Sequence, residues 1–358
     1  MKLLSILFIA IFLPFESFGA KGPWCLIAVD SVSDLGPLPR PPAVPGRDGG
    51  WSGPAFGKEL WSFGDSFITT AGEDGMKIRS STATWSDGHS HTNWREALTP
   101  AGIPEQFIPY TRDEILSNKN DSQNGWALWG GPVLFQKDSE VFLLYSKVHR
   151  INGNGFHTTG VGLAKVAEGM TIAIREAGLL FSEPEPLFGN GAAFVHGDFI
   201  YLYECEMTSK LQMGCRIARV PKEKIASRND FQFYDGLQWV SEISKVAWIL
   251  QGVASGFSVA WNEYAGAFVA VHSQLLGAGI WLRTAPAPEG PWSEPVKIPA
   301  DDERILRPWK EAIFGNYLAL QHPGLKRDKG REIFVTYSRP FGMFNLEVRA
   351  ARIRIQKK

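Results

Sequence analysis

Apolar and polar residues alternate in five stretches of this 358-residue chain, and polar turn residues interrupt the later four. This alternation has the two-residue period of a half-buried strand, so each stretch predicts a β-hairpin. The stretches are ELWSFGDSF, GPVLFQKDSEVFLLYSKV, AAFVHGDFIYLYECE, FSVAWNEYAGAFVAVHS and YLALQHPGLKRDKGREIFVTYSRP. The predicted turns lie at Lys137-Asp138, Gly197-Asp198, residues 262–266 and residues 326–330. Five similar hairpins constrain the fold more than any other feature of the chain.

A second repeated feature gives the length of the repeat. An aromatic residue followed by Ser-Glu occurs at Phe181 and Trp292, and Trp239 precedes Ser241-Glu242; the aromatics are 58 and 53 residues apart. Repeats of this size, built from four short strands, predict an all-β fold: a five-bladed β-propeller filling residues 46–355. The 37 Gly and 23 Pro favour short strands and turns over long helices. A two-sheet sandwich is the structural alternative.

The last unit contains only three strands after Leu318 and ends with LEVRAARIRI. We therefore expect Cys25 to Val32 to supply its fourth strand, so that an N-terminal strand closes the ring.

The first twenty residues carry Lys2, an apolar run to Phe15 and small residues near the end, which is typical of a secretory signal peptide. Residues 1–20 are predicted to be this signal peptide and residues 21–358 one propeller domain. The product is expected to be secreted or periplasmic. Lys+Arg and Asp+Glu both number 37, which gives no reason to expect nucleic acid or a membrane as partner.

Cys205 and Cys215 flank EMTSKLQMG between two apolar strands. We expect a cross-strand disulfide there, with two buried free thiols as the alternative. Neither CxxC nor HxxxH accompanies these cysteines, so no metal site and no cofactor are predicted. His89 and His91 are interpreted as solvated histidines.

Residues 88–125 form the least regular segment and exceed the length of an ordinary connection. We interpret this segment as a loop inserted after the first blade that covers part of one end of the ring, the mouth.

Residues 46–67, GRDGGWSGPAFGKELWSFGDSF, are predicted to form a turn carrying Asp48, a strand from Trp51 to Phe56, a reversal at Gly57-Lys58 and a second strand reaching Asp65. Because the strands are antiparallel, both aspartates lie at the same end of the hairpin. This places two carboxylates where they can share one substrate. The alternative is that both are ordinary turn residues.

The same topological rule predicts further residues at the mouth. They comprise carboxylates, amides, histidines and tryptophans, a mixture suited to a neutral polyhydroxylated ligand, since sugar C–H faces pack on aromatic rings. These candidate substrate-binding residues are Arg79, Trp126, Trp129, Lys147, His149, Asn190, Glu204, Glu206, Ser255, His272, Ser338 and Arg339. Glu204 is also a reserve acid, because its place in the third unit matches that of Asp65 in the first. For Arg79, a position at a blade edge is the alternative.

Three motifs, GRDGGWS, WSFGDSF and FVTYSRPFGMFNLEVRAARI, resemble the exported bacterial family labelled domain of unknown function 4185 (DUF4185). Some of its members form glycoside hydrolase family 183, the endo-D-arabinanases. The resemblance implies a five-bladed propeller and a catalytic Asp pair, carried onto Asp48 and Asp65. The chain departs from the pattern at Ser66, where Thr is usual, at Ser80, where Asn is common, and at Pro340-Phe341. These departures leave the particular glycan open.

Glycosidic cleavage uses one carboxylic acid and one carboxylate. We therefore expect an exported glycoside hydrolase that cleaves a polysaccharide or glycan, with an arabinofuranoside as candidate substrate and Asp48 and Asp65 as the pair. Asp48 is expected to act as base or nucleophile and Asp65 as the acid, although the sequence leaves the two roles nearly interchangeable. Neither GxSxG nor GxxxxGK[ST] occurs. The alternative is a non-catalytic glycan-binding or cell-surface scaffold. A sialidase-like enzyme is less favoured, because only Arg79 and Arg339 are expected at the mouth.

Overall fold

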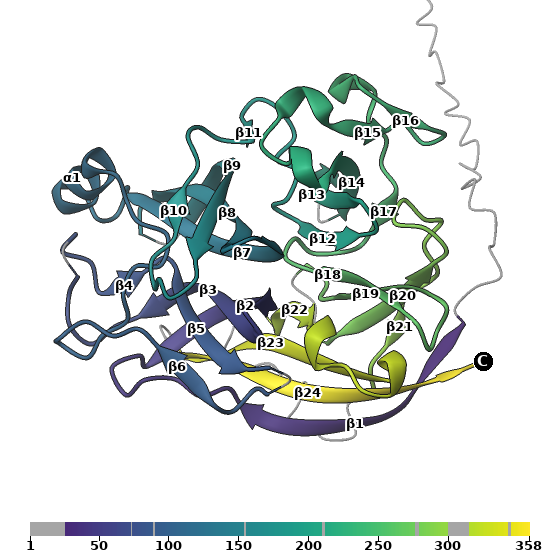
Figure 1. The fold of residues 1–358 in the computed structure, drawn as a ribbon, viewed down its shortest axis with the longest axis horizontal. Helices are drawn as coiled ribbons and strands as arrows, with labels where there is room; N and C mark the ends of the chain where they lie inside the picture. The colour runs from purple at the N-terminus through teal and green to yellow at the C-terminus, as the bar shows by residue number, and fades with distance from the viewer. Residues whose placement is uncertain are drawn as a thin grey trace, which may run out of the picture.

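The computed structural model describes residues 26–72, 74–88, 90–153, 155–209, 212–275, 279–299, 315–342 and 345–358. The predicted signal peptide, Cys25 and His89 lie outside these residues. Five small sheets are arranged around a common centre (Figure 1), which confirms the predicted five-bladed β-propeller.

Each sheet is one blade, and in blades 1 to 4 the first strand in the sequence lies innermost. In blade 5 the innermost strand is β22, and the N-terminal strand β1 forms the outer edge. Blade 1 contains β2 (Gly46–Ala55), β3 (Lys58–Phe67), β4 (Ile78–Arg79), β5 (Thr82–Asp87) and β6 (Trp94–Glu96). Blade 2 contains β7 (Trp126–Lys137), β8 (Glu140–Ile151), β9 (Gly155–Ala167), β10 (Ile174–Arg175) and β11 (Phe181–Ser182).

The remaining blades follow the same plan. Blade 3 contains β12 (Ala192–His196), β13 (Phe199–Ser209), β14 (Gln212–Pro221), β15 (Gln232–Tyr234), β16 (Trp239–Val240) and β17 (Leu250–Gln251). Blade 4 contains β18 (Ser258–Asn262), β19 (Ala267–His272), β20 (Trp281–Ala285) and β21 (Val296–Lys297). Blade 5 contains β22 (Tyr317–Gln321), β23 (Glu332–Gly342), β24 (Asn345–Lys357) and β1 (Ile27–Pro37). Single-turn 3₁₀ helices occupy Lys222–Lys224, Arg228–Asp230, Ile243–Lys245, Pro323–Leu325 and Asp328–Gly330.

The N-terminal strand closes the ring as predicted. β1 runs antiparallel to β24 from the pair Ile27 and Lys357 to the pair Pro37 and Arg349, and it lies outside β24 in Figure 1. The observed strand extends beyond the predicted end at Val32, because pairing continues past two register shifts.

The turn of the first hairpin lies one residue earlier than predicted. β2 ends at Ala55 and β3 begins at Lys58, so Phe56 and Gly57 make the reversal, with φ of 52° and 72°. Two successive left-handed residues form the hairpin turn that matches the right-handed twist of the strands.

The core consists of apolar layers between neighbouring blades. Alternate residues of each strand point to opposite faces of its sheet, and both faces are covered by the adjacent blades. Leu60 of blade 1 and Leu143 of blade 2 share one layer, for example, and Val271 of blade 4 and Val335 of blade 5 share another. Each blade is therefore stabilised mainly by its two neighbours.

The segment predicted as an inserted loop contains regular structure. It contributes β6 to blade 1 and helix α1 (Arg112–Asn120), which begins with a capping box formed by Thr111 and Glu114. Phe107 and Ile108 are buried in the layer between blades 1 and 2. The segment therefore packs into the propeller as well as lying on it.

The predicted disulfide between Cys205 and Cys215 is confirmed, and it joins directly paired residues of β13 and β14. Disulfides persist in oxidising compartments, which fits an extracellular protein. None of the helices in the described residues is both long and apolar enough to cross a bilayer.

Candidate active site

The innermost strands β2, β7, β12, β18 and β22 contact one another around the centre of the ring. In a propeller these strands run in the same direction, so their first residues share one mouth with the last residues of the second strands. Asp48 lies near the start of β2 and Asp65 near the end of β3.

Asp48 lies within a strand, in contrast to the predicted turn. β2 begins at Gly46, and its pairing with β3 skips Asp48 between Arg47 and Gly49. This irregularity is a β-bulge, which redirects a side chain without ending the strand. Ser338 of β23 stabilises the bulge, because its hydroxyl accepts a 3.0 Å hydrogen bond from the backbone N–H of Gly49.

The two aspartates are direct neighbours. The backbone N–H of Asp65 donates a hydrogen bond to the Asp48 carboxylate. The Tyr317 hydroxyl of β22 donates a second one of 2.7 Å to Asp48 Oδ2. A Cβ atom on Gly64 would lie only 2.8 Å from Asp48 Oδ1, so glycine is required between the two carboxyl groups.

The environment of Asp48 favours its neutral form. Burial raises the pKa of Asp48 to about 7, and the negative charge of Asp65 adds to this effect. The hydrogen bonds from Tyr317 and the Asp65 N–H, and the charge of Arg150, oppose the rise in pKa. Asp48 is therefore mostly protonated below pH 7.

Asp65 has cationic and polar partners instead. Arg150 of β8 binds both oxygens of its carboxylate, at 3.0 Å for Nη2 to Oδ1 and 3.4 Å for Nη1 to Oδ2. The indole N–H of Trp129 donates a 3.0 Å hydrogen bond to Oδ1. The charge of Asp65 is therefore compensated by a bidentate ion pair.

Asn190 and Ser255 lie close to each other and to the Trp129 strand. The Ser255 hydroxyl donates to the backbone oxygen of Asn190 at 3.1 Å, and Ser146 donates to Asn190 Oδ1 at 3.1 Å. Ser146 pairs directly with Trp129. A row of polar groups therefore extends from Asp65 across blades 2, 3 and 4.

Trp126 lies on the other face of blade 2 from Trp129, because their positions on one strand differ by three, an odd number. Lys147 Nζ lies 4.5 Å from the centroid of the Trp126 ring, and His149 packs on the same ring. Lys147 also pairs with Glu114 of α1 at 2.9 Å. These residues do not contact the carboxyl pair.

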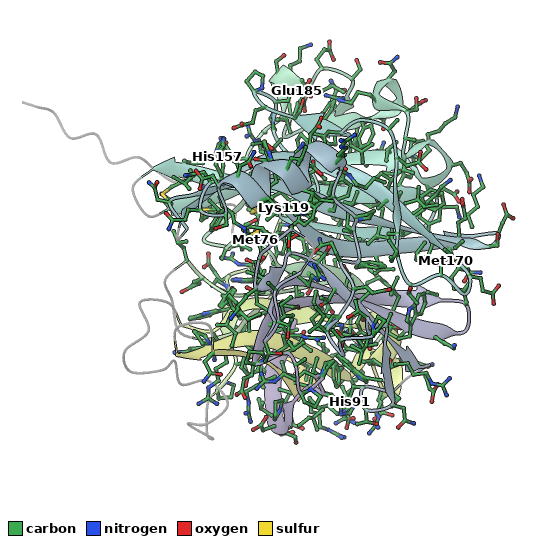
Figure 2. All side chains as sticks on the ribbon, turned by 90° about the vertical axis from the view of Figure 1, so that its left-hand side faces the viewer. Met76, His91, Lys119, His157, Met170 and Glu185 are labelled. Carbon is green, nitrogen blue, oxygen red and sulfur yellow. A yellow bond between two sulfur atoms is a disulfide. The ribbon has the colours of Figure 1, made fainter. Side chains whose placement is uncertain are left out.

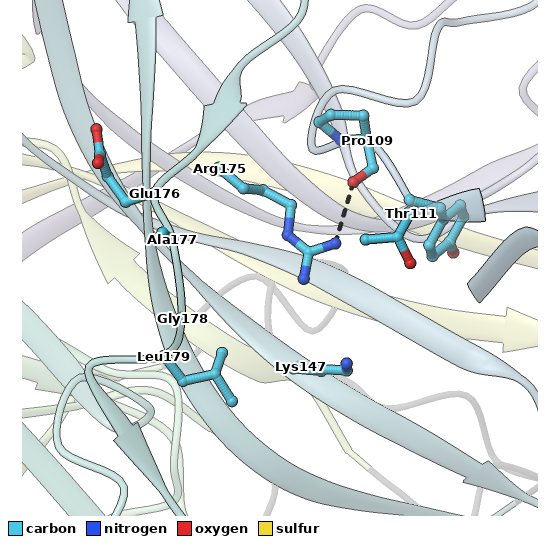
Figure 3. Close-up of a pocket in the computed structure, with 9 residues that line it drawn as sticks. Pro109, Thr111, Lys147, Arg175, Glu176, Ala177, Gly178 and Leu179 are labelled. Atoms are coloured by element: carbon cyan, nitrogen blue, oxygen red, sulfur yellow. Dashed lines mark hydrogen bonds between the residues drawn. The ribbon is translucent and has the colours of Figure 1, made fainter. Parts of the chain in front are cut away.

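A pocket of about 480 Å³ lies on this second face (Figure 3). Lys147, Tyr110 and Arg175 are among its lining residues. Arg175 donates to the backbone oxygen of Pro109 and binds Glu114. These contacts attach α1 and the segment before it to blade 2.

Three predicted binding residues are nearly or fully buried. Arg79 donates to the backbone oxygen of Pro104 at 3.2 Å. Glu204 pairs with Arg216 at 2.9 Å, although burial still raises the pKa of Glu204. The 0% exposed His272 binds the backbone oxygen of Ser273, and burial lowers its pKa to about 4. None of these side chains offers an open surface to a ligand.

Ser338 is also fully buried, where it binds the Gly49 N–H, and the other predicted residues at the mouth keep some exposure. Arg339 is partly exposed, and its Nη1 lies 3.9 Å from Glu347. Glu206 is half exposed and binds Arg216.

Two residues of the site, Arg150 and Tyr317, were not predicted from the sequence. Alternation would have placed Arg150 on the same face of blade 2 as Trp129, whereas the predicted Lys147 and His149 fall on the opposite face. Tyr317 is the first residue of the innermost strand of blade 5. That position corresponds to the start of β2, near which Asp48 lies. This correspondence between blades is the sequence signal that could have indicated Tyr317 as a residue of the mouth.

The fold defines the class of protein, the five-bladed β-propellers, and glycoside hydrolases are among its structural neighbours. A Bacteroides ovatus protein described as a hydrolase has a TM-score of 0.59 and 16% identity, with 87% of each chain covered. An exo-β-1,3-galactanase from Phanerochaete chrysosporium has a TM-score of 0.53 and 12% identity, covering 90% of this chain and 64% of the galactanase. A GH43_1 enzyme from Xanthomonas citri has a TM-score of 0.51 and 10% identity, covering 89% and 90%.

The chain belongs to the DUF4185 family, since the model of that domain of unknown function matches residues 50–340. No curated protein sequence matches the chain. At identities of 10–16% the structural neighbours establish the fold alone.

Proposed function

We propose that this protein is an exported glycoside hydrolase that cleaves a polysaccharide or glycan with Asp48 and Asp65. The observation that carries the proposal is the contrast between two adjacent carboxyl groups. Asp48 has a pKa raised to about 7, whereas Asp65 is bound by Arg150 and Trp129. Two carboxyls with opposite protonation are what hydrolysis of a glycosidic bond requires.

The proposed roles follow from this contrast. Asp48 donates its proton to the glycosidic oxygen as the bond from that oxygen to the anomeric carbon breaks. Asp65 either attacks the anomeric carbon or accepts a proton from the water that does so. If Asp65 attacks, water then breaks the bond between Asp65 and the anomeric carbon and gives its proton to Asp48. If Asp65 is the base, it takes the proton of the water and releases it to solvent, from which Asp48 regains a proton. From the sequence, Asp48 was the expected base or nucleophile and Asp65 the expected acid, with the two roles nearly interchangeable. The partners of the two carboxyl groups favour the reverse assignment.

Arabinofuranosides are the first substrates to test, because the motifs resemble those of endo-D-arabinanases. Export is supported by the signal-peptide pattern of residues 1–20 and by the Cys205–Cys215 disulfide.

The experiment is a screen of arabinans, galactans, fructans and arabinoxylan for new reducing ends at pH 6. Wild type is compared with Asp48→Asn and Asp65→Asn. We expect wild type to cleave at least one glycan, and each variant to lose a hundredfold or more in rate, roughly the contribution of a general acid or base. Equal product release by all three proteins would remove the aspartates from the mechanism.

The second candidate function is a glycan-binding scaffold, which the row of polar groups from Asp65 to Ser255 would also serve. It predicts that wild type binds a glycan without releasing reducing ends and that both Asn variants bind it equally well.

A further inference from the structure

Phe156 is a large apolar side chain that is 62% exposed, near the start of β9. It pairs directly with Arg150 of β8. Side chains of directly paired residues lie on the same face of a sheet. Arg150 is the residue that binds Asp65, so Phe156 lies beside the carboxyl pair although it comes from the third strand of the blade.

Trp129 connects Phe156 to the same carboxylate. The two ring centroids are 4.8 Å apart with an interplanar angle of 71°, an edge-to-face contact. The same Trp129 donates its indole N–H to Asp65 Oδ1. Two aromatic rings therefore extend from Asp65 towards solvent. Trp129 is held by its hydrogen bond to Asp65, and Phe156 packs on Trp129.

The β8–β9 hairpin that carries Phe156 lies at the surface. Figure 2 shows the neighbouring His157 near the edge of the molecule. His157 points to the other face of β9, since it is adjacent in the strand, and it contacts Glu183 at 2.7 Å. Phe156 is thus open to a large ligand.

We propose that Phe156 and Trp129 form an aromatic platform that binds the C–H face of a neutral sugar ring next to the scissile bond. Sugar rings present apolar C–H faces that pack on aromatic rings. The inference rests on the proposed function, because the bound ring belongs to the glycan that the carboxyl pair cleaves.

The platform implies a substrate of more than one sugar. One ring must reach Asp48 and Asp65, and a second ring covers Phe156. A small aryl glycoside leaves Phe156 uncovered, so loss of the ring should raise KM for an oligosaccharide and leave KM for an aryl glycoside unchanged.

The test is electrophoresis of the full chain through native gels containing linear arabinan, β-1,3-galactan or levan. The variants are Phe156→Ala and Phe156→Tyr, and the matched control is Leu237→Ala, an apolar residue 91% exposed on blade 3. We expect at least one polysaccharide to retard wild type and Leu237→Ala. Phe156→Ala should bind about threefold to tenfold more weakly, the range of a single aromatic contact, and Phe156→Tyr should bind as wild type does. Unchanged thermal melting shows that the variants fold.

Either of two results overturns the platform: equal retardation of Phe156→Ala and wild type, or no retardation of wild type in any gel. The platform and the hydrolase proposal fail separately. Retardation that depends on Phe156 without reducing ends removes the hydrolase alone, whereas cleavage that is indifferent to Phe156 removes the platform alone.

Discussion

At the scale of single residues, two aspartates on one hairpin differ only in their partners. Asp48 accepts hydrogen bonds from Tyr317 and the Asp65 N–H in a partly buried position, whereas Asp65 is bound by Arg150. Burial and a neighbouring negative charge favour the neutral carboxyl, and a guanidinium favours the carboxylate. The raised pKa of Asp48 and the ion pair of Asp65 thus arise from residues on blades 1, 2 and 5.

The pH dependence of hydrolysis tests the proposed role of Asp48. Because the acid must be protonated, kcat/KM should fall as pH rises through about 7, the pKa of Asp48. The Tyr317→Phe variant removes a hydrogen bond that lowers this pKa, so its alkaline limb should lie at higher pH. A profile of kcat/KM from pH 5 to 9 checks both points. An alkaline limb that stays in place or moves to lower pH contradicts the assignment.

Asp48 should also reduce stability in its charged form. Its pKa rises from 3.8 to about 7 on folding, so the folded state binds more protons between these values and loses stability as pH rises across them. Asp48→Asn should therefore raise the free energy of unfolding by roughly 1–3 kcal/mol at pH 8, since each pKa unit corresponds to about 1.4 kcal/mol. Urea unfolding at pH 8 and pH 4 measures this. Equal effects at both pH values would be inconsistent with a charge penalty, and Asp65→Asn, which breaks an ion pair, is the control.

At the scale of elements, the β-bulge in β2 orients Asp48, and blade 5 maintains that bulge. The Gly49 N–H, which normal pairing would direct to β3, binds the buried Ser338 hydroxyl instead. A strand of one blade therefore sets the position of a carboxyl group on the next.

Removal of this hydroxyl should affect both stability and rate. Ser338→Ala leaves the buried Gly49 N–H without its acceptor, which costs about 1–3 kcal/mol. We expect a lower urea midpoint and a reduced kcat with nearly unchanged KM, and partial recovery of both in Ser338→Thr. An alanine variant with wild-type kcat would show that the hydroxyl does not position Asp48.

The alternation of apolar and polar residues predicted the strands. It also indicates which side chains of a strand share one face of the sheet, and this second signal separates Trp129 from Trp126. Trp126 and Trp129 were both predicted to lie at the mouth, but only Trp129 contacts the carboxyl pair. Arg150 could have been found by the same parity. The bulge at Asp48 could not, because it depends on Ser338 from a strand almost three hundred residues away.

At the scale of the whole molecule, the propeller depends on an N-terminal strand to complete its last blade. The repeat length of 53 and 58 residues and the three-stranded last unit were enough to predict five blades and ring closure. The contacts between blades were not predictable, since they depend on the angles at which the sheets pack. The start of β22 could have been matched to the start of β2, but the hydrogen bond from Tyr317 to Asp48 across two blades could not be predicted, whereas the Cys205–Cys215 bridge within one blade was.

The contribution of β1, which closes the ring, to the free energy of unfolding can be measured with substitutions in that strand. Ile27 is 0% exposed and packs in the layer between blades 4 and 5, whereas the adjacent Leu26 is 41% exposed. Ile27→Ala should lower the free energy of unfolding by about 2–5 kcal/mol, the cost of a cavity in a core. Leu26→Ala should change it by less than about 0.5 kcal/mol. Similar values for the two variants, measured by urea unfolding, would indicate that β1 is not integral to the ring.

The most direct test of the account is a crystal structure of the Asp48→Asn variant with a bound oligosaccharide of the glycan that wild type cleaves. We predict that the glycosidic oxygen lies within hydrogen-bond reach of the side chain at position 48, about 3 Å, and that the adjacent anomeric carbon faces Asp65. An oligosaccharide bound at the opposite end of the ring, or at the mouth with both positions out of reach of its glycosidic bonds, would contradict the proposed hydrolase.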